Sequence, residues 1–314
     1  MPLYINNSAL RLLSECETKF WVQFHKQRAM HDHKIGAMEV GQYFHMLFES
    51  LLLTRTCDYK ACWDSIFHDE VPQEEKYSYS NILNIAMEWK SRIVEWLQEV
   101  EVVGKPEEYF EIPFGTIFGE EVIYYGTRDA RINWKGKHYL VDLKTSGSID
   151  ESSEILWRMS SQLKGYTWAA KEQGFDDIQG VIIPAVEIRK VPPYDGKLDK
   201  KCSVHKTKYA ECQHAHIKTM LGGPFSFSKH QLKQWKADTE QLIGRAIAVR
   251  SCESLNAVTM DGTWKWPGCS RCQYQRWCEA ERPVEALTQI MVHKEWKRGS
   301  GNPDHKQAAI PLGN

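Results

Sequence analysis

The segment from residue 126 to residue 145 constrains the fold of this chain more than any other. It falls within two stretches that are rich in β-branched and aromatic residues, EEVIYYGTRDARINW and KHYLVDLKTS, with a turn at 135–137 between them. This composition predicts two paired strands. Because residues two apart in a strand face the same side, Asp142 and Lys144 should project together. Asp129 should then lie near Asp142 across the ladder.

Two carboxylates on neighbouring strands form a hard-oxygen site that suits Mg²⁺ or Mn²⁺. A lysine beside such a cation can orient or deprotonate an attacking water and stabilise charge that develops on a phosphate. Asp-x-Lys by itself also fits a surface strand with ordinary charges. Here LVDLKTS begins as an apolar strand, so the charged pair lies at the end of a buried element, where charges are costly unless they coordinate or pair. The context therefore favours metal-assisted phosphodiester hydrolysis.

The remaining elements predict an α/β fold. A third strand is expected at EYFEIPFGTIF, a helix over 151–173, a buried strand at GVIIPAVEI and a further helix over 228–250, all behind a largely helical N-terminal part. We expect one domain over 1–285 and then a flexible tail over 286–314. Its predicted parts are a helical lobe (1–103), a catalytic core with a mixed sheet (104–190), a basic irregular insertion (191–227) and a helix with a cysteine cluster (228–285).

Composition limits how the chain could bind DNA. Of its 314 residues 42% are hydrophobic and 26% charged, and the formal net charge is −1, so no global field attracts it to nucleic acid. Binding would need a local basic surface. Between residues 189 and 208 seven Lys/Arg stand against two Asp, which fits either a solvated loop or a flap that contacts phosphates.

The sequence also bears on location and partners. It shows neither a secretory signal nor an apolar run that could span a membrane, and its nine cysteines fit a reducing compartment. We therefore expect a cytoplasmic protein, or one of the host cytoplasm if a phage encodes it. No P-loop is present, so any unwinding of DNA would come from a partner.

Two further motifs each allow two interpretations. His45 follows Gly41 on a predicted helix with apolar neighbours, where a histidine is either structural or a ligand. Gln162 and Tyr166 lie four residues apart on the next helix and should share one face. They could form a polar contact between helix and sheet, or hydrogen bonds to a DNA backbone.

The order of these motifs carries a resemblance. Gly-x-x-x-His, Gly-x-x-Asp, Asp-x-Lys-Thr and Gln-x-x-x-Tyr follow one another between residues 41 and 166. This series resembles the RecB-like branch of the PD-(D/E)XK nuclease superfamily, which includes recombination exonucleases and CRISPR-associated adaptation nucleases. The resemblance implies a restriction-endonuclease-like core, with a mixed central sheet flanked by helices. It implies these metal ligands: His45, Asp129, Asp142 and the backbone carbonyl of Leu143.

The same resemblance assigns roles to the other residues. Lys144 would be the catalytic lysine, working with Asp129 and Asp142, and Gln162 and Tyr166 would complete the characteristic helix. Glu111, in FEIPF, matches a position where relatives often carry a glutamate that faces the site.

The cysteines suggest a second centre. Cys269, Cys272 and Cys278 form a compact group, one thiolate short of a tetrahedral site. In the iron–sulfur members that this chain resembles, one cysteine near the start joins three near the end, which implies Cys16 as the fourth ligand. Four thiolates can hold a 4Fe–4S cluster or zinc, and zinc sites usually pair two Cys-x-x-Cys knuckles, so the layout favours the cluster. Unrelated free thiols are a third possibility.

A cluster would connect the two ends of the chain as a structural staple. Separately, a group of cysteines and histidines in the basic segment could ligate zinc, although their spacing matches no common knuckle: Cys202, His205, Cys212, His214 and His216.

Three functional hypotheses follow. The leading one is a metal-dependent DNA exonuclease that acts on DNA ends or single strands, together with a helicase, recombination or CRISPR partner. The second is a non-catalytic subunit of the same fold that binds DNA ends or serves assembly; intact acidic and lysine positions argue against it. The third is an iron–sulfur scaffold for protein contacts only, which predicts no metal-dependent DNA affinity.

Overall fold

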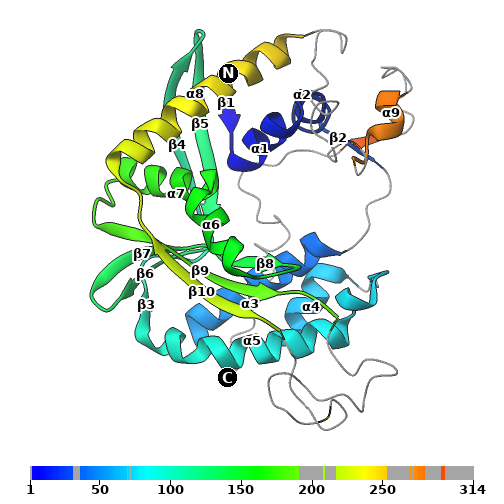
Figure 1. Cartoon of the computed structure of the whole chain (residues 1–314), viewed down its shortest axis with the longest axis vertical. Helices are drawn as coiled ribbons and strands as arrows, with labels where there is room; N and C mark the ends of the chain where they lie inside the picture. The colour runs from blue at the N-terminus through cyan, green and yellow to red at the C-terminus, as the bar shows by residue number, and fades with distance from the viewer. Residues whose placement is uncertain are drawn as a thin grey trace.

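A six-stranded mixed sheet forms the centre of the molecule (Figure 1). The computed structural model describes residues 2–30, 36–68, 70, 72–190, 208, 217–252, 269, 272–279 and 291–293. In the sheet β10, β9, β7, β6 and β3 are neighbours in that order, and β8 pairs with β9. The pairs β7/β9 and β8/β9 are parallel and the others antiparallel. The strands are β3 (Val100–Val102), β6 (Ala130–Trp134), β7 (Lys137–Val141), β8 (Lys144–Ser146), β9 (Ile178–Glu187) and β10 (Thr219–Phe225).

A second sheet of three strands contains β1 (Leu3–Ile5), β5 (Glu120–Arg128) and β4 (Glu108–Ile117), with β5 in the middle. A short antiparallel pair joins β2 (Arg28–Met30) to β11 (Met291–His293). The predicted tail over 286–314 therefore contains a strand that pairs with the N-terminal region.

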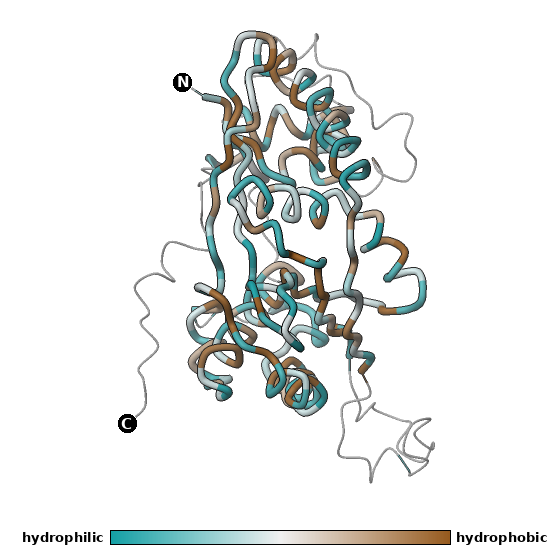
Figure 2. The backbone as a smooth tube through the Cα atoms, turned by 90° about the vertical axis from the view of Figure 1, so that its left-hand side faces the viewer, coloured by the Kyte–Doolittle hydropathy of each residue, from teal (hydrophilic) through white to brown (hydrophobic). Residues whose placement is uncertain are grey.

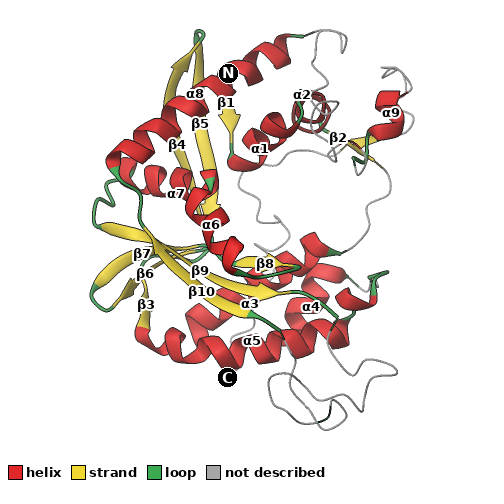
Figure 3. Ribbon diagram, in the orientation of Figure 1, coloured by secondary structure: helices red, strands yellow, loops and turns green. Residues whose placement is uncertain are grey.

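Helices cover both faces of the central sheet (Figure 3). On one face lie α3 (Ala37–Thr54), α4 (Tyr59–Phe67) and α5 (Tyr79–Glu99), and on the other α7 (Ser161–Glu172) and α8 (Lys229–Ser251). Asparagine, aspartate and serine side chains cap the helix starts, for example Ser228 at α8. The short helical elements are α1 (Asn7–Glu15), α2 (Glu17–Phe20), a π-helix (Trp21–His25), a 3₁₀ turn (Glu75–Tyr77), α6 (Glu151–Met159) and α9 (Gln275–Glu279).

Alternation along the central strands separates two hydrophobic cores. Val181 and Ile183 of β9 point into the core with α7 and α8, whereas Ile182 and Val186 point into the core with α3 to α5. Because both faces of β9 are covered, its sequence is a nearly continuous apolar run. The prediction of a buried strand at GVIIPAVEI is confirmed. Figure 2 shows hydrophobic and hydrophilic residues alternating along the helices that supply these cores.

The predicted helical lobe is not one unit. Helix α1 packs with α7 and α8, on the opposite side of the sheet from α3 to α5. Its buried face, with Leu10 and Leu13, contributes to the same core as Trp235 of α8. The first part of the chain therefore wraps the sheet instead of stacking on one face.

Several predicted elements are interrupted. The expected helix over 151–173 breaks at Ser160, whose side chain caps α7 by accepting a hydrogen bond from the Leu163 N–H. The expected strand over 120–134 breaks at Asp129, so that β5 and β6 belong to different sheets. The next strand breaks at Asp142 and Leu143, between β7 and β8. Each of the two predicted site carboxylates thus lies at a strand break.

The basic insertion expected over 191–227 ends earlier than predicted, because 219–225 forms β10. Apart from Lys208, residues 191–216 lie outside the described residues, and with them the proposed second zinc site. Among the helices that the structure describes, none is long and apolar enough to cross a membrane.

Candidate active site

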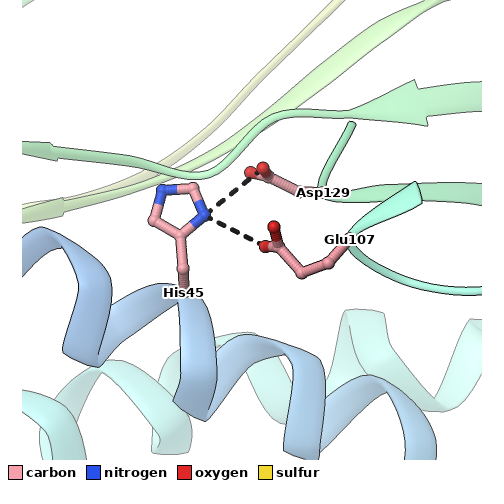
Figure 4. Close-up of side chains that lie close together, drawn as sticks. All are labelled: His45, Glu107 and Asp129. Carbon is pink, nitrogen blue, oxygen red and sulfur yellow. Dashed lines mark ion pairs between the residues drawn. The ribbon is translucent and has the colours of Figure 1, made fainter. Parts of the chain in front are cut away.

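Three side chains from different elements converge beside the central sheet. His45 comes from the middle of α3, Glu107 directly precedes β4, and Asp129 joins β5 to β6 (Figure 4). Nδ1 of His45 lies 3.3 Å from Oδ1 of Asp129 and 3.5 Å from Oε1 of Glu107. One ligand atom of each residue lies within 4.8 Å of those of the other two. This spacing allows one cation to contact all three.

The electrostatics of this trio favour a positive charge at its centre. Burial lowers the pKa of His45, but Asp129 and Glu107 outweigh that effect and raise it to about 10. Burial raises the pKa of Glu107, and Asp129 raises it further, while His45 lowers it. The carboxylates of Glu107 and Asp129 are partly or fully buried and lie close together, so their negative charges repel each other. A positive charge between them, from an imidazolium or a metal cation, offsets this repulsion.

Asp129 is oriented by the strand break opposite it. Its Oδ2 accepts a hydrogen bond of 2.5 Å from the backbone N–H of Leu143. Leu143 itself is fully buried in the core with α3 to α5, which agrees with the predicted alternation. The backbone N–H of Asp142 in turn donates to the carbonyl of Ile182 in β9 at 3.1 Å. The carboxylate is thus fixed by backbone that belongs to the central sheet.

A series of polar contacts connects Asp142, through Lys144 and Gln162, to Tyr166. Nζ of Lys144 lies 2.6 Å from Oδ2 of Asp142 and donates to Oε1 of Gln162 at 2.8 Å. Nε2 of Gln162 donates to the hydroxyl of Tyr166 at 3.0 Å. Asp142 is almost fully buried; burial raises its pKa, and Lys144 counteracts that effect. Burial also raises the pKa of Tyr166, so the hydroxyl stays protonated.

The trio of His45, Glu107 and Asp129 adjoins the polar contacts that run from Asp142 to Tyr166. The pKa of Asp142 responds not only to Lys144 but also to Asp129 and His45. The structure therefore brings the predicted residues of α3, both strand breaks and α7 into one neighbourhood. Gly41, one turn before His45, also faces this region, because a Cβ there would lie 3.5 Å from Oγ1 of Thr145.

The glutamate at the site is Glu107, and the expectation for Glu111 was wrong. Glu111 is exposed on β4 and accepts a hydrogen bond of 2.5 Å from the Tyr109 hydroxyl. Glu107 lies in a turn with φ of 51° after Pro106, and its N–H donates to the carbonyl of Asp129 at 2.9 Å. A non-glycine residue with positive φ is uncommon and gives little sequence signal. The only local hint is its place just before a strand.

The four cysteines expected to form a cluster come from both ends of the chain. Cys16 lies between α1 and α2, and Cys278 lies on α9. Burial raises the pKa of Cys269, and the neighbouring Cys16 and Cys272 raise it further. The Cys16 and Cys272 thiols thus affect the pKa of Cys269, although among the described residues no three cysteine sulfur atoms lie within 4.8 Å of one another. None of the cysteines that the structure describes forms a disulfide.

Comparison with known proteins gives the family. The sequence pattern of the PD-(D/E)XK nuclease superfamily matches residues 4–279, from β1 to α9. Among solved structures the chain is similar to the crystal structure of SSO0001, at 15% identity and a TM-score of 0.32, over 84% of this chain and 94% of that one. That TM-score is too low to support an argument. A search among curated proteins gave no match. On the strength of the match over residues 4–279, this chain belongs to the PD-(D/E)XK nuclease superfamily.

Proposed function

We propose that this protein is a metal-dependent DNA exonuclease of the RecB-like branch, which hydrolyses phosphodiester bonds at DNA ends or in single strands. One observation carries the proposal. The trio of His45, Glu107 and Asp129 adjoins the Asp142–Lys144 pair, in which Asp142 is buried, and Lys144 donates a hydrogen bond to Gln162 of α7. Superfamily membership supports nuclease chemistry.

The donor set fits Mg²⁺ or Mn²⁺. One imidazole nitrogen and several carboxylate oxygens suit Mn²⁺, and the carboxylates suit Mg²⁺. We assign His45, Glu107, Asp129 and Asp142 as the residues that hold the cation, with the Leu143 carbonyl as a further ligand. When bound, the cation would supply Lewis acidity and lower the pKa of a coordinated water.

The protein's own groups then have separate tasks. Lys144 presents a positive charge beside Asp142 and stabilises negative charge that develops on the phosphate. Gln162 accepts a hydrogen bond from the ammonium group of Lys144, and Tyr166 accepts one from Gln162. In this arrangement Gln162 and Tyr166 are positioning residues, since they act through Lys144.

A helicase, recombination or CRISPR partner would supply unwinding, and the cytoplasm is the expected location.

The test is an assay of the purified protein on end-labelled single- and double-stranded DNA with Mg²⁺ or Mn²⁺. Asp142→Ala and Lys144→Ala should each reduce cleavage by at least about 10²-fold. Lys137→Ala and Asp177→Ala, at exposed positions away from the site, should cleave at the wild-type rate. Thermal melting would establish that all four variants are folded. Cleavage that persists in both site variants would exclude this active site, and DNA binding without any cleavage would favour the non-catalytic subunit.

We also propose that Cys16, Cys269, Cys272 and Cys278 hold a 4Fe–4S cluster, with zinc as the alternative. Support comes from the effect of Cys16 and Cys272 on the pKa of Cys269 and from the partial burial of Cys272 and Cys278 against the core around α1 and α8. A cluster there would join the two chain ends. Protein purified without oxygen should be brown and contain iron and sulfide. Colourless protein that contains zinc would overturn the cluster.

A further inference from the structure

A pocket of about 800 Å³ lies beside the proposed active site, between α1, α7 and α8. Its volume is within the range of sites that bury a ligand of several hundred daltons. The trio of His45, Glu107 and Asp129 does not line it. Gln162 does, and Gln162 accepts a hydrogen bond from the Nζ of Lys144. The pocket and the active site thus meet at one side chain.

The walls of the pocket combine apolar and polar side chains with two cationic groups, the Arg11 guanidinium and the Lys164 ammonium. Arg11 of α1, Lys164 of α7 and His230 of α8 line it from three helices. One acidic residue, Asp238, also lines the pocket and accepts a hydrogen bond of 2.8 Å from Gln234, so the two cationic side chains outnumber the single carboxylate. The first turns of all three helices also border the pocket, and their N–H groups add to a potential that favours anions. The chemistry of this pocket therefore fits phosphate groups.

The helices that form the pocket wall are joined by buried contacts. The indole N–H of Trp235 donates to the hydroxyl of Ser161 at 2.9 Å and ties α8 to the start of α7. Trp235 is buried in the core that α1 also joins. The backbones of the three helices are consequently held in place around the pocket, as a preformed site requires.

Helix α6 ends at the pocket and carries exposed apolar side chains. Helix α6 buries none of its residues. Ile155, Leu156 and Met159 are 61%, 66% and 70% exposed, and Met159 lines the pocket. Exposed apolar side chains of this size beside a cationic groove suit contact with nucleobases, since proteins place Leu, Ile and Met against or between unstacked bases. An unpaired strand presents base faces at every nucleotide, whereas a duplex presents them only where a base step is unstacked, so an apolar surface of this kind favours an unpaired strand.

We propose that the pocket between α1, α7 and α8 holds the single strand of DNA that leads to the scissile phosphate. Its phosphates contact Arg11, Lys164 and His230, and its bases contact Met159 and the apolar face of α6. This inference rests on the proposed function and names the substrate form that the site takes. It also assigns the nucleic-acid surface to a protein whose net charge of −1 gives no global attraction.

The test measures fluorescence anisotropy of a labelled single-stranded oligonucleotide in EDTA, across a series of salt concentrations. Arg11→Ala and Lys164→Ala should each raise Kd by about 3- to 10-fold, and each should reduce the slope of log K against log salt by about 0.7. Met159→Ser should raise Kd without a change in slope, because it removes an apolar contact. Lys233→Ala is the matched control, because Lys233 is exposed on α8 but does not line the pocket.

The outcomes separate this inference from the proposed function. If Asp142→Ala abolishes cleavage while Arg11→Ala and Lys164→Ala bind and cleave as the wild type does, the active site stands and the pocket assignment fails. If wild-type protein never cleaves but the pocket variants lose DNA affinity, the pocket stands and the nuclease proposal fails. Equal losses in Lys233→Ala, or tighter binding of blunt duplex than of single strand, would also overturn the pocket assignment.

Discussion

The backbone N–H of Leu143 donates a 2.5 Å hydrogen bond to Oδ2 of Asp129, and this contact joins the two strand breaks of the site. It leaves Oδ1 of the same carboxylate facing His45 at 3.3 Å. The orientation of Asp129 is therefore set by the main chain of the neighbouring strand, not by its own rotamer alone. Pre-organisation of this kind keeps a ligand in place before a cation arrives.

Glu107→Gln should weaken Mn²⁺ binding by about 10- to 100-fold, because it removes one carboxylate of the trio. Isothermal titration with Mn²⁺ measures the change. Glu111→Gln is the control: its side chain is exposed and hydrogen-bonded to Tyr109, so affinity should not change. A loss confined to Glu111→Gln would reverse the assignment made from the structure.

The affinity for Mn²⁺ should rise with pH. In the metal-free protein the pKa of His45 is raised to about 10, so a cation that binds Nδ1 must displace a proton. Titrations in buffers between pH 6 and pH 9 should show affinity that rises with pH, together with the release of about one proton for each cation bound. His45→Gln should flatten this dependence as well as weaken binding. An affinity that stays constant over the range would argue against His45 as a ligand.

The stability of the metal-free protein should show the opposite trend. The pKa of His45 is about 10 in the folded protein, against 6.5 for an unperturbed histidine in the unfolded chain, so folding favours the protonated form. The resulting stabilisation is fully present below pH 6.5 and is lost as the pH rises through 10. Urea unfolding at several pH values, compared with His45→Gln, isolates this contribution. Equal pH dependence in both proteins would contradict it.

Gly165→Ala should destabilise the protein by about 1–3 kcal/mol. A Cβ at Gly165 would fall 2.9 Å from Cζ2 of Trp235 and would also clash with the hydroxyl of Tyr124. Both rings are buried and cannot move away, so the clash outweighs the gain in helix propensity of about 1 kcal/mol. Gly41→Ala on α3 meets only Thr145 at 3.5 Å and should be neutral or stabilising. Denaturant midpoints compare the two variants, and a stabilised Gly165→Ala would refute the packing argument.

Cys16→Ser should remove the visible absorption of the proposed cluster and lower the Tm, because the staple between the chain ends is lost. Cys62→Ser is the matched control, since Cys62 is buried among α3 to α5 on the other face of the sheet. Its spectrum should equal that of the wild type. Iron content that is unaffected by Cys16→Ser would exclude Cys16 as a ligand.

Local patterns in the sequence predicted much of the fold. The β-branched and aromatic composition predicted the strands, the apolar run predicted β9, and helical patterns predicted α8 and the helix that carries His45. The spacing of Asp142 and Lys144 placed their side chains together, and the structure has them 2.6 Å apart. These features depend on neighbours two to four residues away, which a single sequence displays directly.

Other features depended on contacts between distant segments. The breaks at Asp129 and Asp142 arise from hydrogen bonds to Leu143 and β9, which are remote in sequence or in another strand. Glu107 reaches the site through a turn of positive φ that is tied to the Asp129 carbonyl.

The strands and helices, the pairing of Asp142 with Lys144, and the family series of motifs could all be read from the amino-acid order alone. The three-dimensional arrangement was needed to show that Glu107 takes the place expected for Glu111, that α1 crosses to the face of α7 and α8, and that a pocket opens beside Gln162. The physical reason is the separation along the sequence between the residues that interact. Periodicity and turn chemistry act between near neighbours, whereas these outcomes depend on packing and hydrogen bonds between segments that meet only after folding.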